Sequence, residues 1–90
     1  MAVEPTSFPP PPFWRTRYCA FEVMARAERR AITPDMVVSV LDRPVRRLAQ
    51  PNGRVRYWGL VRELGGYLSV ITLADGRTVH TYYVDEEFRP

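Results

Sequence analysis

The chain has 90 residues, of which 46% are hydrophobic and 26% are charged. This composition is typical of one small folded domain and excludes a disordered chain, a coiled coil and a multidomain enzyme. One cysteine (Cys19) and one histidine (His80) exclude an internal disulfide framework and a structural zinc site. The chain has no apolar run of the roughly 18 residues that span a membrane, and its first twenty residues do not read as a signal peptide, so we expect a cytoplasmic protein without membrane contact.

All thirteen basic residues are arginines, and they are unevenly distributed. Residues 15–62 contain eleven arginines and four acidic residues, a net charge of +7, whereas residues 63–90 have a net charge of −3. A GC-rich genome would explain the absence of lysine, but codon usage does not concentrate charge in one half of a chain. The basic half predicts an anionic partner, either nucleic acid or an acidic protein. A domain this small also gains stability from association, so a homodimer is a further expectation.

The N-terminal part of the sequence predicts a tail followed by helices. Residues 1–13 contain the run Pro9–Pro12 and predict a proline-rich extended tail, which leaves residues 14–90 as a single α+β domain. Residues 17–31 have the spacing of an amphipathic helix with a charged face. Thr33 is then a candidate N-cap with Pro34 at the first helical position, and Pro44 ends this second helix.

The remaining sequence alternates between strand and turn patterns. Residues 45–50, 54–64, 66–74 and 78–88 are rich in β-branched and aromatic residues and are separated by short turns, which predicts an antiparallel meander. The expected fold is α+β, with two N-terminal helices packed on a four-stranded antiparallel β-sheet. Alternation places Arg54, Arg56, Trp58 and Arg62 on one face of the second strand, and His80 with Thr78 and Tyr82 on one face of the last.

This order of elements, with the segment FEVMARAERRAITPDMVVSVLDRP followed by GRVRYWG, resembles the domain of unknown function family 4258. The positions that match the family pattern are Arg26, Arg30, Ile32, Thr33, Val37, Val38, Pro44, Arg56, Tyr57 and Gly59. Two positions depart from it, because Glu22 stands where the family helix usually has histidine and Ala31 where it has glycine. The family looks related to the RelE/ParE toxins, so the resemblance implies a RelE-like fold, RNA cleavage without metal or cofactor, and an acidic antitoxin as partner.

Metal-independent RNA cleavage needs a base, a cation on the phosphate and an acid for the leaving oxygen. The candidate catalytic residues are Glu22 as base, Arg26 and Arg30 on the phosphate, and His80 as acid. The alternative for Glu22 and Arg26 is an exposed i,i+4 ion pair on a helix. For His80 the alternative is an ordinary surface or packing residue of a strand.

A second set of residues combines arginine with aromatic rings, a combination that RNA binding by base stacking and phosphate contact would use. The candidate nucleic-acid-binding residues are Arg29, Arg46, Arg47, Arg54, Arg56, Trp58 and Tyr82. The alternatives are a solvated arginine face and, for Tyr82, packing in the core. The leading hypothesis is a toxin-related protein that binds RNA, including ribosome-bound mRNA, and cleaves it. The alternative is a noncatalytic module of the same fold that binds an acidic partner.

Overall fold

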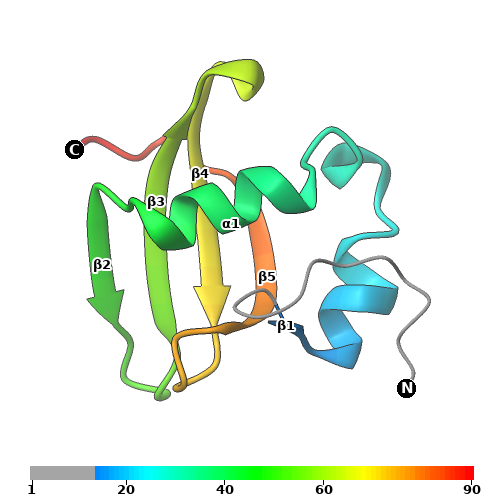
Figure 1. The fold of residues 1–90 in the computed structure, drawn as a ribbon, viewed down its shortest axis with the longest axis vertical. Helices are drawn as coiled ribbons and strands as arrows, with labels where there is room; N and C mark the ends of the chain where they lie inside the picture. The colour runs from blue at the N-terminus through cyan, green and yellow to red at the C-terminus, as the bar shows by residue number, and fades with distance from the viewer. Residues whose placement is uncertain (1–13) are drawn as a thin grey trace.

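The computed structural model describes residues 14–90, with the side chain of Trp14 excepted, so the predicted tail, residues 1–13, lies outside the described residues. The described residues form an α+β fold, in which one helix crosses one face of a β-sheet and the shorter helical segments lie at one side of the sheet (Figure 1). The fold class is therefore confirmed at this level.

Five strands form the sheet, in the order β1-β5-β4-β3-β2. The antiparallel meander consists of β2 (Arg46–Ala49), β3 (Val55–Val61), β4 (Gly66–Thr72) and β5 (Thr78–Val84), which confirms the four predicted strands. The two-residue strand β1 (Trp14–Arg15) was not predicted, and it pairs in parallel with β5. A strand of two residues has no alternation that a sequence pattern would reveal.

The turn between β2 and β3 follows the predicted Pro-Asn-Gly sequence. Gly53 adopts a φ of 90°, and its N–H donates to the carbonyl of Gln50, whose own N–H donates to the carbonyl of Arg54. This is a type I turn with a one-residue bulge, in which glycine takes the left-handed position. The turn fixes the register of β2 against β3.

The second predicted helix is present as α1 (Pro34–Asp42). The Thr33 hydroxyl caps it by accepting the Met36 N–H at 3.2 Å, and Pro34 opens the helix, as predicted. Its buried residues Val37 and Val40 face the sheet, and Val40 lies directly over Gly59 of β3. The absence of a side chain at Gly59 therefore allows α1 to approach the sheet closely.

The first predicted helix is wrong as a single element. Residues 17–31 form a short helical turn that continues as a π-helical segment, η1 (Cys19–Val23), then an extended residue at Arg26, and then a 3-10 turn, η2 (Ala27–Arg29). Cys19 and Val23 are buried in the core, and Arg29 donates from Nε to the Tyr82 carbonyl at 2.7 Å. These tertiary contacts override the helix propensity of the sequence, so α1 is the one main helix of the described residues.

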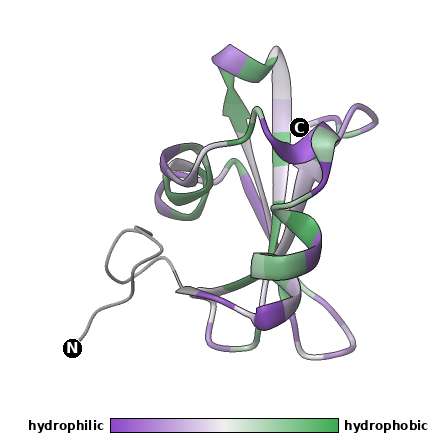
Figure 2. Cartoon of the chain, turned by 90° about the vertical axis from the view of Figure 1, so that its right-hand side faces the viewer, coloured by the Kyte–Doolittle hydropathy of each residue, from purple (hydrophilic) through white to green (hydrophobic). Residues whose placement is uncertain are grey.

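The hydrophobic core lies between the sheet and these helical segments. Figure 2 shows α1 end-on at one side of the sheet, and the C-terminal end of the chain lies on the other side. Cys19 is fully buried in this core, and burial raises the pKa of its thiol to about 12, against a smaller opposing effect of the Arg15 charge. The thiol therefore stays protonated at neutral pH and is not a nucleophile.

Candidate nucleic-acid interface

The face of the sheet away from α1, called here the open face, carries the arginine and aromatic residues of the meander. The strand register places on it Arg46, Leu48, Arg56, Trp58, Leu60, Tyr67, Ser69, Ile71, Thr81 and Tyr83. Val55, Tyr57, Gly59 and Val61 face α1 instead and are buried. The predicted alternation of β3 is confirmed for Arg56 and Trp58, whereas Arg54 precedes the strand and Arg62 begins the 3-10 turn η3 (Arg62–Leu64).

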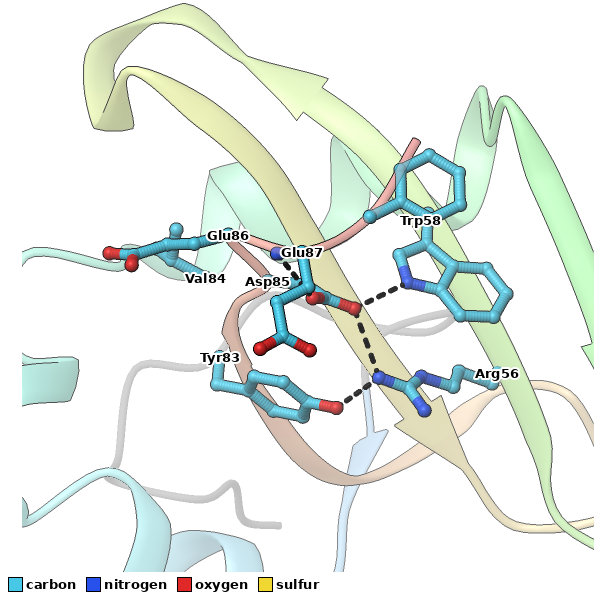
Figure 3. A pocket seen from close by; sticks show the side chains of 8 residues that line it. Arg56, Trp58, Tyr83, Val84, Asp85, Glu86 and Glu87 are labelled. Carbon is cyan, nitrogen blue, oxygen red and sulfur yellow. Dashed lines mark hydrogen bonds and ion pairs between the residues drawn. The ribbon is translucent and has the colours of Figure 1, made fainter. Parts of the chain in front are cut away.

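Arg56 is fixed on the open face by three side-chain hydrogen bonds (Figure 3). Its Nε donates to the hydroxyl of the fully buried Ser69 at 2.9 Å, and its Nη2 donates to the Tyr83 hydroxyl and to the Asp85 carboxylate. Its guanidinium carbon lies 4.7 Å from the ring centroid of Trp58 and 5.4 Å from that of Tyr83. Nη1 has no hydrogen-bond partner among residues 14–90, so this nitrogen can bind an additional acceptor.

Asp85 joins Arg56 and Trp58, and with Tyr83 these residues form a cluster on the open face. Its Oδ2 accepts from Trp58 Nε1 at 2.9 Å and from Arg56 at 3.1 Å, and its Oδ1 accepts from the Glu87 N–H at 3.1 Å. The pKa of Asp85 is lowered, chiefly by the Trp58 hydrogen bond and further by the Glu87 N–H and the Arg56 charge, although burial opposes the shift. Asp85 is therefore an ionised structural partner of Arg56.

Trp58 is present on the open face but is covered. Phe88 stacks on it with ring centroids 5.0 Å apart, and Tyr67 meets Phe88 edge-on. Only 7% of Trp58 is exposed, and Arg46 lies 5.2 Å over the Phe88 ring. The predicted stacking of a base on Trp58 therefore requires Phe88 to move, whereas Tyr83 is only half-buried.

An open pocket lies beside this cluster and has a mixed charge. Its polar lining consists of Arg56, Tyr83, Asp85, Glu86 and Glu87, and the last two carboxylates are exposed. The exposed arginines Arg46 and Arg47 lie instead on β2, on opposite faces of the strand. Acceptors are thus concentrated in the pocket, and cations are concentrated at the hairpin.

The predicted catalytic residues are not joined into one site. Glu22, Arg26 and Arg30 are exposed, and the extended backbone at Arg26 breaks the helical spacing that would have paired it with Glu22. Within residues 14–90, no hydrogen bond or ion pair connects any two of Glu22, Arg26, Arg30 and His80.

His80 has a separate environment near the first helical turn. Its Nδ1 is hydrogen-bonded to the Thr16 hydroxyl at 3.1 Å, and its ring stacks on Tyr18 with centroids 4.8 Å apart. Burial lowers the pKa of His80, and the Arg54 charge lowers it further. The neutral imidazole is therefore favoured at pH 7, which does not suit the predicted role as a proton donor.

Two of the predicted nucleic-acid-binding residues are structural. Tyr82 is 2% exposed, lies in the core, and has a pKa raised to about 12, mainly by burial. Tyr82 pairs with the buried Val70, and a register shift, in which Ile71 pairs with Thr81 but Thr72 pairs with Val79, interrupts the alternation of the strand at His80. Arg29 is bonded to the Tyr82 carbonyl and to Glu28 at 3.1 Å.

The hairpin arginines have mixed surroundings. Arg46 and Arg47 are exposed, and Arg54 is half-buried. The guanidinium of Arg47 also lies 5.8 Å over the Tyr57 ring. Arg46 and Arg47 thus remain the most accessible cations of the predicted binding set.

Sequence reasoning missed Asp85 and Glu87 as members of the site. The motif Asp85-Glu86-Glu87-Phe88 was visible in the sequence as an acidic end that contains one aromatic residue. Its position beside Arg56 depends on the register of β3, β4 and β5 together, which no single strand reveals.

In the part of the chain that the structure describes, no group of three or more His, Cys, Asp or Glu residues is placed to hold a metal ion. Over the same residues, no helix has the length and apolar character needed to cross a membrane. The chain matches no family model, and neither a curated protein nor a solved structure matches it.

Proposed function

We propose that this protein binds single-stranded RNA across the open face of its sheet. The observation that carries the proposal is Arg56, which lies against the rings of Trp58 and Tyr83 with Nη1 free of any partner among residues 14–90. Arginine beside aromatic rings is the combination that binds phosphates and stacks bases in single-strand binding proteins. The exposed Arg46 extends this surface to the edge strand β2, and the exposed Arg47 adds a cation on the other face of the same strand.

The separation of charge on the open face determines how RNA would lie. Phosphates would contact the arginines of the β2–β3 hairpin, where they meet no carboxylate. A base would enter the pocket, where Glu86 and Glu87 can accept hydrogen bonds from its exocyclic amine and Tyr83 offers a ring for stacking. Such a base must be unpaired, because a base within a helix exposes neither its ring face nor its pairing edge.

The resemblance to family 4258 supports RNA as the ligand and a toxin-related role with an antitoxin partner. Cleavage of the RNA is the second candidate function, and the observation in its favour is that Arg56, Tyr83 and Glu87 share one pocket. In this site Arg56 would hold the phosphate and the exposed Glu87 carboxylate would accept the 2′-hydroxyl proton. The 2′-oxygen would then bond to phosphorus as the bond to the 5′-oxygen breaks, and the leaving oxygen would take a proton from water.

The test is the fluorescence anisotropy of a labelled, unstructured RNA 12-mer titrated with protein at several salt concentrations. Two double variants with the same change in charge are compared, R46Q/R47Q on the edge strand β2 and R26Q/R30Q on the predicted helical site. R46Q/R47Q is expected to weaken binding at least tenfold and to reduce the salt slope by about 1.4, since each phosphate contact to a single strand contributes about 0.7. R26Q/R30Q is expected to change the affinity less than threefold.

The same RNA, incubated with excess protein in EDTA, shows whether cleavage accompanies binding. Products that disappear in E87Q but persist in E22Q would assign the base to the pocket. Equal losses of affinity in the two double variants would contradict the open-face site.

A further inference from the structure

We infer that the free edge of β2 is a docking surface for an acidic, extended segment of a partner protein, which adds to the sheet as a further strand. This inference concerns an edge of the sheet, whereas the proposed RNA site concerns its open face. It gives the acidic-partner alternative a specific surface, and it does not depend on RNA binding.

The first observation is that β2 has only one neighbour. It is the last strand in the sheet order, it pairs only with β3 among residues 14–90, and all four of its residues are exposed. The flanking Val45 is 53% exposed, and Leu48 within the strand is 51% exposed. An edge strand with exposed apolar side chains is a template for pairing with another chain.

The second observation is which main-chain groups are free. The Gln50 N–H donates to the Arg54 carbonyl at 2.7 Å, and residues opposed across an antiparallel pair alternate between bonded and nonbonded positions. Two positions further along, Leu48 faces Arg56 as the next bonded pair, so its main-chain groups point toward β3. The N–H and carbonyl groups of Arg47 and Ala49 point away from the sheet and are available to a further strand.

The third observation is the charge along this edge. Residues 43–62 contain six arginines and no acidic residue. The side chain of Arg43 is 89% exposed, and Arg46 and Arg47 are exposed on opposite faces of the strand. A second copy of this chain would bring like charges together at this edge, whereas an acidic strand would pair with arginines on both of its faces.

These observations define the chemistry of the partner segment. It is extended, it offers its own N–H and carbonyl groups to Arg47 and Ala49, and it carries carboxylates beside Arg46 and Arg47 with an apolar side chain beside Leu48. RNA satisfies the charge but has no main chain that matches the spacing of a β-strand, so the observations favour a protein segment.

The probe is a fluorescein-labelled octapeptide with two adjacent central glutamates, one for each face of the strand, flanked by valine and threonine. Two control peptides have lysine in place of glutamate, or N-methyl groups on the two central residues to prevent strand pairing. Only the unmodified acidic peptide is expected to bind. Amide hydrogen exchange followed by NMR is expected to slow by at least fivefold at Arg47 and Ala49 on peptide addition, with no change at Leu48.

Variants of the protein distinguish the contribution of the main-chain groups of β2 from that of its charge. A49P removes the outward N–H at a position where an edge strand tolerates proline, and A49T is the matched control that keeps the N–H. A49P is expected to weaken peptide binding at least tenfold and to leave RNA affinity unchanged. R47Q is expected to weaken peptide binding more than R26Q, which removes the same charge elsewhere.

Three results would overturn the inference. These are equal binding of the lysine peptide, equal binding of the N-methylated peptide, or unchanged amide exchange at Arg47 and Ala49 in the wild type. Slow exchange of these two amides without peptide, together with concentration-dependent dimerisation, would assign the edge to a second copy of the chain. Because RNA affinity is measured in parallel, loss of this inference leaves the proposed RNA function standing, and the reverse also holds.

Discussion

At the scale of single residues, the open face is organised by the small side chain at position 69. Ser69 pairs with Trp58 across β3 and β4, is fully buried, and accepts a hydrogen bond from Arg56. A larger residue there would compete with the guanidinium for the space between Trp58 and Tyr83. The alternation of β3 predicted that Arg56 and Trp58 share a face, but this supporting serine comes from another strand and was not predicted.

His80 shows how local environment decides between a chemical and a structural role. Its contacts with Thr16 and Tyr18 and its lowered pKa favour the neutral ring in the folded state. An unfolded histidine binds a proton near pH 6.5, so the folded state loses stability as pH falls through this value. Asp75 and Asp85 have lowered pKa values, so their protonation reduces the stability of the folded state only below about pH 4.

We therefore expect the free energy of unfolding to decrease between pH 7.5 and pH 5.0 in the wild type. H80Q cannot titrate in this range, so its stability should change less over the same interval. Urea unfolding at both pH values measures the difference. An equal decrease in the two proteins would show that His80 is not the titrating group.

At the scale of elements, α1 depends on the absence of a side chain beneath it. A Cβ atom at Gly59 would lie 3.0 Å from a methyl group of Val40 and 3.3 Å from its Cα. The helix backbone would therefore have to move away from β3, and overpacking of this kind typically costs about 1–3 kcal/mol.

The expected result is that G59A lowers the free energy of unfolding by about 1–3 kcal/mol. The matched control is G66A in β4, where a Cβ atom would meet nothing within 4 Å. Thermal or urea unfolding of both variants measures the effect. Equal stability of G59A and G66A would mean that α1 adjusts without cost.

The elements also show how much of the fold the sequence could predict. The cap at Thr33, the glycine turn at Gly53 and the alternation of β3 are local signals, and each predicted its feature correctly. The break at Arg26 and the register shift near His80 depend on contacts with distant strands. Residues 17–31 do have the spacing of an amphipathic helix, but the burial of Cys19 and Val23 determines the conformation that this segment adopts.

At the scale of the whole molecule, the charge asymmetry seen along the sequence becomes an arrangement in space. The acidic residues that follow β5 lie beside Arg56, and the arginines of residues 43–54 occupy the hairpin at the far edge of the sheet. Three of the four predicted catalytic residues were chosen by spacing on one helix, and that helix does not form as one element. Of the residues placed on one face by strand alternation, Arg56 and Trp58 lie together on the open face.

The most direct test of the central claim is to map RNA contacts by NMR on the wild-type protein. Titration with the unstructured RNA 12-mer should shift the amide signals of Arg46, Arg56, Tyr83 and Glu87, and leave those of Glu22, Arg26 and Arg30 unchanged. This result would place the RNA on the open face. Shifts confined to residues 17–31 would contradict the account and return the site to the N-terminal segment.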